Sequence, residues 1–323
     1  MLRSVRFYSV GNPWPASEQE LSDKLAGAAF KPCGPHVERS SGFEPPAHAQ
    51  SGLFARRVGG ADLLRLRSQV RVLPAGALNE ALEVRLDEYR ARMQEEPGRR
   101  TKRQLKEQMR DELLPKTLLR SERTSALYIA AERVLAVGSG SESRAARLIE
   151  HLRSALSHLD ATPLEFTRPF GELLAGVFTG NGPRELVLAH ECRLRETSED
   201  KGTVRWQNVD LARAAVQRCL KDGMELTHLG FEYGNALRAV LDARGTVTKL
   251  ELLGQDAADL GGEDDVTRQD AEIALLGGTL RELLATLRRT LGGEPAGAAR
   301  RPAAPPEPIV SGTAPPHLSL VTA

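Results

Sequence analysis

The chain has 323 residues, of which 27% are charged and 41% apolar, and its formal net charge is +1. This composition is typical of a soluble globular protein of one or two domains, and no apolar run approaches the roughly 20 residues that a membrane span needs. Aromatic residues make up only 4% of the chain, which argues against stacking on exposed bases as the main mode of any nucleic-acid contact.

The cysteine content indicates the compartment. Cys33, Cys192 and Cys219 are odd in number, lie far apart and form no CxxC motif, so the sequence predicts neither a disulfide framework nor a zinc site. The N-terminal segment is too poor in apolar residues for a secretory signal peptide. A reducing cytoplasm is therefore the expected setting.

The first forty-six residues predict a strand, a helix and a loop. Residues 3–10 have the alternation of a strand. A helix should begin at Ser17, because Glu20 follows three residues later in the spacing of a capping box. Residues 30–46 are rich in proline and glycine and predict a structured loop.

Two strands should follow, at residues 52–58 and 61–73. The second carries Arg65, Arg67 and Arg71 at even spacing. Because side chains alternate between the two faces of a strand, these three arginines are expected on one face.

Two helices come next, over residues 77–94 and 99–120. The first has an apolar stripe at steps of three and four residues, and residues 95–98 (EEPG) break it because proline ends a helix and glycine supplies the turn. Two helices joined by four residues are expected to pack antiparallel, as a helical hairpin that projects from the body.

The second helix concentrates positive charge. It holds eight lysines and arginines against three acids, although the whole chain is almost neutral. Lys102, Lys106 and Arg110 recur every fourth residue and form a basic stripe beside an apolar one. Such a patch attracts polyanions, so nucleic-acid contact is one interpretation. A solvated helix face is the other, and it describes most charge runs.

The remaining chain mixes strands and helices without a regular βαβ alternation, so we predict the α+β class. Strands or extended segments are expected at residues 124–131, 133–137, 164–167, 185–196, 203–206, 225–233, 236–242 and 246–252, and helices at 141–158, 169–178, 211–220 and 267–291. Residues 256–265 are acidic and predict a loop. Residues 295–323 contain seven prolines and predict a disordered tail, which leaves residues 1–294 as the folded part.

No sequence motif indicates an enzyme. Gly138–Ser141 lies between a strand and a helix but lacks the lysine of a phosphate-binding Walker loop. Glu263, Asp264 and Asp265 could bind the metal of a nuclease, although a surface loop is the simpler interpretation. His190, Glu191 and Cys192 have no partner at metal-ligand spacing and are interpreted as incidental.

Five stretches are similar, in the same order, to bacterial proteins of one family. They are Ala29–Pro46 (AFKPCGPHVERSSGFEPP), Val72–Leu86 (VLPAGALNEALEVRL), Leu105–Lys116 (LKEQMRDELLPK), Thr124–Leu164 and Gly277–Gly293 (GGTLRELLATLRRTLGG). The loop with FxPCG and the hairpin that ends in LLP are fairly specific together. The chain resembles the RdgC family of recombination-associated proteins over residues 1–294.

The resemblance implies a curved subunit that forms a ring-shaped homodimer around double-stranded DNA. The implied function is DNA binding without sequence specificity that antagonises the RecA recombinase, in the cytoplasm at the nucleoid. The resemblance implies no cofactor, metal or catalytic residue. Whether single-stranded DNA is also bound stays open.

The resemblance also assigns roles to residues. DNA-binding residues carried over by position are Arg67, Arg71, Lys102, Lys106 and Lys116, with Arg99, Arg103 and Arg110 added from charge and spacing. The hairpin end should close the ring. This chain has Leu118 where the family commonly carries an aromatic, and Leu119 follows it, so the contact should stay apolar with less area and no stacking. The segment 204–209 corresponds to a basic strand of the family, and Arg205 is carried over there as a further DNA-binding residue. The neighbouring lysine and glutamine of the family are missing, so DNA affinity from that side should be weaker. A second hypothesis is a scaffold whose basic arm binds an acidic partner, such as the 256–265 loop of another subunit.

Overall fold

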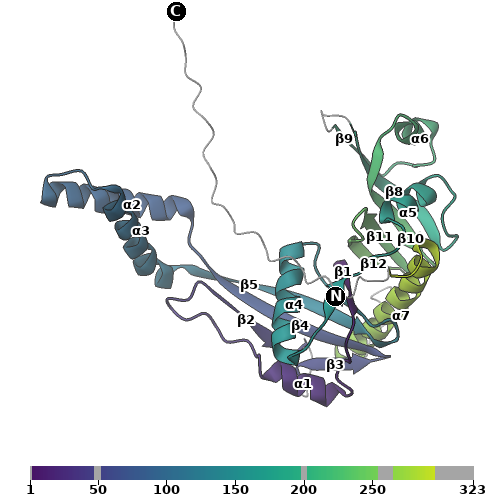
Figure 1. Ribbon diagram of the computed structural model, residues 1–323, viewed down its shortest axis with the longest axis horizontal. Coiled ribbons are helices and arrows are strands. Elements are labelled where there is room, and N and C mark those ends of the chain that lie inside the picture. Colours follow the sequence, from purple (N-terminus) through teal and green to yellow (C-terminus); the bar gives the residue numbers. More distant parts are fainter. Residues whose placement is uncertain (1, 47–51, 198–201, 254–264, 295–323) are drawn as a thin grey trace, which may run out of the picture.

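The structure is a computed structural model that describes residues 2–46, 52–197, 202–253 and 265–294 (Figure 1). It is a mixed α/β structure built on a large antiparallel sheet. The strands are β1 (Ser4–Val10), β2 (Arg39–Glu44), β3 (Ala55–Val58), β4 (Ala61–Val72), β5 (Leu118–Ile129), β6 (Val134–Val137), β7 (Ala161–Pro163), β8 (Leu186–Arg195), β9 (Thr203–Gln207), β10 (Glu225–Tyr233), β11 (Leu237–Asp242) and β12 (Val247–Leu252).

The helices cover parts of this sheet. They are α1 (Glu18–Ala26), α2 (Ala75–Met93), α3 (Arg99–Leu113), α4 (Glu142–Leu156), α5 (Phe170–Phe178), α6 (Ala214–Lys221) and α7 (Asp265–Leu291), with short 3₁₀ turns η1 (Leu114–Lys116) and η2 (Ala130–Glu132). Figure 1 shows a bent arrangement, with α2 and α3 at one end and β8, β9 and α6 at the other. The strand order along the sheet is β2-β4-β5-β6-β1-β12-β11-β10-β8-β9, while β3 pairs with β4 and β7 pairs with β1.

The N-terminal part of the sheet is buried on both faces. One face packs against α1 and α4 through residues such as Leu64, Leu66 and Tyr128. The opposite face packs against α7 through Leu63 and Leu127. Because successive side chains alternate in direction, burial on both faces requires consecutive apolar residues, as at Leu63–Leu64 of β4 and Ala126–Ile129 of β5.

The C-terminal strands β8 to β12 have one buried face and one open face. Their apolar side chains, among them Leu194, Phe231 and Leu241, join the core formed with α5 and α7. The predicted apolar stripe of α7 is buried there, and Gly277 allows close packing, since a Cβ at that position would lie 3.0 Å from the Ala61 Cβ. The other face of these strands carries polar and charged side chains.

The helices α2 and α3 lie side by side beyond the end of β4 and β5 (Figure 1). Leu86 of α2 and Met109 of α3 are buried between them, and an ion pair of 3.0 Å joins Arg85 to Glu112. Few other residues of the two helices are buried, so most of their surface is exposed.

Most predicted elements are present within one to three residues of their expected ends. The helix that starts after Ser17 is confirmed, since the Ser17 hydroxyl accepts a hydrogen bond from the Glu20 amide at 3.1 Å. The helix predicted over residues 99–120 ends at Leu113, and a 3₁₀ turn follows it over Leu114–Lys116. The β5 strand begins at Leu118 rather than at residue 124, because it pairs with β4 along its whole length. The predicted helix 211–220 begins only at Ala214.

Two predictions about extended structure were wrong. Residues 30–46 were predicted as a loop, but they contain β2, which pairs with β4 in a contact that local sequence does not reveal. Residues 164–167 were predicted as a strand, whereas the strand of this region is β7, which pairs with β1. The acidic segment up to residue 264 and the tail 295–323 lie outside the described residues.

Asp62 provides a test of the fold. Its buried carboxylate accepts hydrogen bonds from the indole of Trp14 (2.7 Å) and from the guanidinium of Arg57 (2.8 Å), and Trp14 stacks on Tyr128. Replacing Asp62 by alanine leaves both donors without their acceptor, so the free energy of unfolding should fall by at least about 2 kcal/mol. Urea unfolding measures this. An unchanged midpoint would show that water replaces the carboxylate without cost.

Candidate nucleic-acid interface

Five of the six basic residues of α3 lie on one side of the helix, and Arg100 lies outside their arc. With about 100° between successive residues, five cations fall within an arc of about 100°. They form the α3 stripe, which consists of Arg99, Lys102, Arg103, Lys106 and Arg110. The arc begins next to buried Met109, so the helix packs on α2 with one side and presents the stripe beside it.

The members of the stripe differ in how far they are neutralised. Arg103 pairs with Glu107 at 3.1 Å, and Arg110 pairs with Glu38. Arg99, Lys102 and Lys106 are exposed and make no ion pair with any residue that the structure describes. These three cations are therefore available to an external anion.

The helix α2 reduces the net charge of this region. It carries acidic side chains, and Arg90 is held by Asp87 (2.6 Å) and Glu96 (2.9 Å). Four acids and three arginines leave α2 nearly neutral, so the excess positive charge of the two helices lies on α3.

The arginines of β4 share one face, as predicted, but they are partly occupied. Arg67 lies over the Phe30 ring at 4.5 Å, and Glu44 lies 3.8 Å from it. Arg123, opposite Arg67 on β5, pairs with the same carboxylate at 2.6 Å. Glu44 thus relieves the repulsion between two facing arginines.

Arg71 has a structural environment. Its guanidinium donates to the carbonyl of Gly34 (3.0 Å) and to the carbonyls of Leu114 (3.3 Å) and Thr117 (3.4 Å). These contacts join the loop before β2 to the turn that follows α3. Of the two predicted β4 contacts, Arg71 therefore has the smaller capacity for phosphate.

The end of α3 exposes apolar surface. Leu118 is 83% exposed and Leu119 is 44% exposed, while Lys116 is exposed beside them. Val72, which pairs with Leu118 across the two strands, is 41% exposed. These three apolar side chains therefore form an exposed apolar patch within the described part of the chain.

Arg205 lies in a row of charged and titratable residues whose other members were not predicted from the sequence. It faces Arg193 of β8, which in turn faces His228 of β10. Arg195 lies on the same face two residues further along β8. The signal was available, because Arg193 and Arg195 alternate with Cys192 and Leu194 in a segment already predicted as extended.

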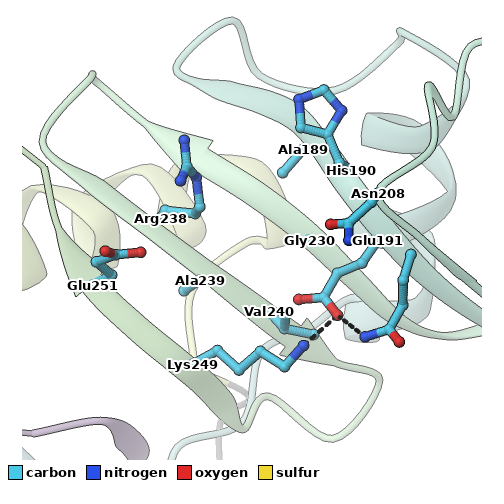
Figure 2. A pocket seen from close by; sticks show the side chains of 11 residues that line it. Ala189, His190, Glu191, Asn208, Gly230, Arg238, Ala239, Val240, Lys249 and Glu251 are labelled. Atoms are coloured by element: carbon cyan, nitrogen blue, oxygen red, sulfur yellow. Dashed lines mark hydrogen bonds and ion pairs between the residues drawn. The ribbon is translucent and has the colours of Figure 1, made fainter.

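Two hollows lie on this open face of the C-terminal strands. Figure 2 shows the first, of about 300 Å³, where Glu191 accepts hydrogen bonds from Lys249 (2.5 Å) and Gln207 (3.4 Å). Arg238 and Glu251 lie on its other side (Figure 2), so its charges balance. Residues 190–192 were interpreted as incidental. In the structure, Cys192 lies in the core, and burial raises the pKa of its thiol to about 12.

The second hollow, of about 430 Å³, is strongly basic. It is lined by four arginines, Arg6, Arg193, Arg195 and Arg244, together with Thr203, Thr227, His228, Asp242 and Ala243. We call it the arginine hollow. Its only carboxylate among the described residues is Asp242, which accepts hydrogen bonds from the backbone amides of Arg244 and Thr246.

The pKa of His228 is lowered, chiefly by burial and then by Arg193, with a smaller effect from Arg205 that Asp242 and Glu191 oppose. Below a pH of about 6.5 the unfolded chain takes up a proton that folded His228 resists, so stability falls as the pH drops through that range. Replacing His228 by asparagine should make the unfolding midpoint less sensitive to acidification between pH 7.5 and 5.5. An equal pH dependence in the variant would contradict this.

Two other features bear on function, namely metal-binding groups and helices that could span a membrane. Within the described ranges, no group of three or more His, Cys, Asp or Glu side chains is arranged to hold a metal ion. Glu263 and Asp264 of the nuclease hypothesis lie outside those ranges, so it stays untested. None of the described helices combines the length and the apolar character that crossing a bilayer requires.

Comparison with known proteins identifies the family. The profile of the family described as "Putative exonuclease, RdgC" matches residues 1–294. Proteins named "Recombination-associated protein RdgC" are similar over most of their length. The one from Laribacter hongkongensis is 34% identical over 87% of this chain and 95% of its own. The one from Shewanella oneidensis is 27% identical over 90% of this chain and 97% of its own length. The one from Pseudomonas aeruginosa is 28% identical over 90% of this chain and 97% of its own length.

The chain therefore belongs to the RdgC family, whose curated relatives are named as recombination-associated proteins. The family resemblance seen in the sequence is confirmed. The names of the relatives differ from the family description in one respect, because only the latter mentions an exonuclease.

Proposed function

We propose that this protein binds double-stranded DNA without sequence specificity, as a ring-shaped homodimer that encircles the duplex, and that it modulates recombination by antagonising RecA at the nucleoid. The observation that carries the proposal is the α3 stripe, where Arg99, Lys102 and Lys106 are exposed without an ion pair among the described residues. Lysine and arginine neutralise phosphates and release counterions, which gives affinity without reading bases.

The bent arrangement supports encirclement. Two basic regions, the α3 stripe and the row around Arg205, lie toward opposite ends of the molecule (Figure 1). A dimer with twofold symmetry that closes at two places needs two self-complementary patches on each subunit. The exposed pair Leu118 and Val72 offers an apolar patch for one of them.

Binding of duplex DNA at increasing salt tests the proposal. Affinity for a random-sequence duplex should fall steeply between about 50 and 200 mM salt, with the same slope for unrelated sequences. Affinity that is independent of salt would contradict the electrostatic basis. The same samples, incubated with Mg²⁺ or Mn²⁺ and linearised plasmid, test the exonuclease named in the family description, and degradation that disappears in an Asp264→Ala variant would favour it.

A further inference from the structure

The two facing arginine pairs of the sheet differ in one respect. Arg67 and Arg123 face each other across β4 and β5, and the Glu44 carboxylate lies between them. Arg193 and Arg205 face each other across β8 and β9, and neither makes an ion pair with any residue in the described ranges. Like charges in directly opposite positions destabilise a sheet. The second pair therefore lacks the internal anion that the first pair has.

The neighbouring side chains increase this excess charge. Arg6 and Arg244 line the same hollow as Arg193 and also lack an ion pair among the described residues. Arg6 donates two hydrogen bonds of 3.2 Å to the carbonyl of Gly140, which fixes its position. Arg195 is only loosely paired, with 3.7 Å to Glu225. The excess is therefore concentrated at one place.

The shape of the site indicates the size of its ligand. A flat row of cations is enough to follow the backbone of a duplex, whereas this site is a hollow of about 430 Å³, within the range of about 300–1,000 Å³ that small-molecule sites occupy. A DNA phosphodiester carries one negative charge, and a chain of linked phosphates carries several. One guanidinium group can donate hydrogen bonds to two phosphate oxygens at once. Several converging arginines therefore favour a chain of linked phosphates over a single phosphodiester.

We propose that the arginine hollow binds a small anion with two or more linked phosphates, such as pyrophosphate or the phosphate chain of a nucleotide. Arg193 and Arg244 bind the phosphate oxygens, and Arg6 and Arg195 complete the charge. The lining residues of the described part include no Phe, Tyr or Trp on which a base could stack, so the phosphate chain is recognised and the base is not.

Binding there has a consequence for DNA, which rests on the proposed function. Arg205 faces Arg193, so an anion in the hollow neutralises charge next to a predicted DNA contact. A bound polyphosphate should therefore weaken duplex binding beyond the effect of its ionic strength.

Calorimetric titration of the full chain with sodium pyrophosphate, at constant ionic strength and without metal ions, tests the proposal. We expect saturable binding and similar affinities for adenosine and guanosine triphosphate. Replacing Arg193 and Arg244 by glutamine should lower these affinities at least tenfold. Arg238→Gln is the control for the loss of one cation and is compared with Arg193→Gln alone, because Arg238 lies on the same sheet face and pairs with Glu232 outside the arginine hollow. Circular dichroism checks the fold of each variant.

Four outcomes separate this inference from the proposed function. Absence of pyrophosphate binding overturns the inference, as does an equal loss in Arg193→Gln and Arg238→Gln. If the double variant loses duplex DNA while the wild type never binds pyrophosphate, the hollow belongs to the DNA surface and the inference is wrong. If pyrophosphate binds and no duplex does, the inference holds and the proposed function fails.

Discussion

Replacing Arg99, Lys102 and Lys106 together by glutamate should weaken duplex binding roughly 100-fold or more at about 0.15 M salt, because three phosphate contacts become repulsive. The slope of affinity against salt, on logarithmic axes, should fall by about 3, since each lost contact removes about 0.9 released counterion. These residues were chosen because they are exposed and unpaired among the described residues, whereas Arg110 is held by Glu38.

The fold should tolerate the three changes. Arg99 and Lys102 lie in the first turn of α3, where negative side chains interact favourably with the helix dipole, and Lys106 is exposed in the middle of the helix. Arg213, Arg218 and Lys221 at α6, each exposed, provide a control with the same change in net charge when replaced by glutamate. Fluorescence anisotropy with a labelled duplex measures both sets. Equal losses would mean that net charge, rather than the α3 stripe, determines binding.

The same variants address the scaffold hypothesis. Loss of DNA binding with intact self-association supports the DNA interface. Loss of self-association alone would instead show that the basic arm contacts an acidic surface of a partner.

Replacing Leu118 by serine should shorten the lifetime of the protein on closed-circular duplex by about tenfold or more. The side chain is 83% exposed, so its removal should change the free energy of unfolding by less than about 0.5 kcal/mol. Burying a leucine at a subunit contact contributes about 1.5–3 kcal/mol for each copy, and a twofold contact contains two. The change should therefore act on ring closure and leave the subunit stable.

Release after a salt challenge measures this effect. On linear duplex a ring can slide off an end, so the lifetime there should change little. Leu118→Phe should lengthen the lifetime on circles, since it restores the aromatic that the family commonly carries and adds apolar area. Val187→Ser is the matched control, because Val187 is 54% exposed on β8, far along the chain from the α3 end. Identical release from circles by wild type and Leu118→Ser would contradict a gate at this position.

Some predicted DNA-binding arginines are already bound to carboxylates or backbone carbonyls of the same chain, so they stabilise the fold and are less available to DNA. Arg67 shares Glu44 with Arg123, and Arg71 uses its guanidinium to hold backbone carbonyls. Both were predicted as DNA contacts by position. The distinction depends on partners that lie 23 to 56 residues away in the chain, so no local reading of sequence provides it.

Several features were determined by the sequence alone. Periodicity and capping were sufficient to predict the helix after Ser17, α7 with its buried leucine stripe, and the basic side of α3. The reason is that the spacing of residues along a helix determines which side chains share a face. The motifs were sufficient for the family.

Only the tertiary structure decided which charges remain unpaired. Glu44 reaches Arg67, and Arg193 comes opposite Arg205, through strand pairing between segments that are distant in the chain. The basic helix therefore looked like the single concentration of charge in the sequence, whereas the folded chain has a second one in the arginine hollow. The physical reason is that a charge is neutralised by whatever lies within a few ångströms in space, and in a sheet those neighbours are set by register rather than by sequence distance.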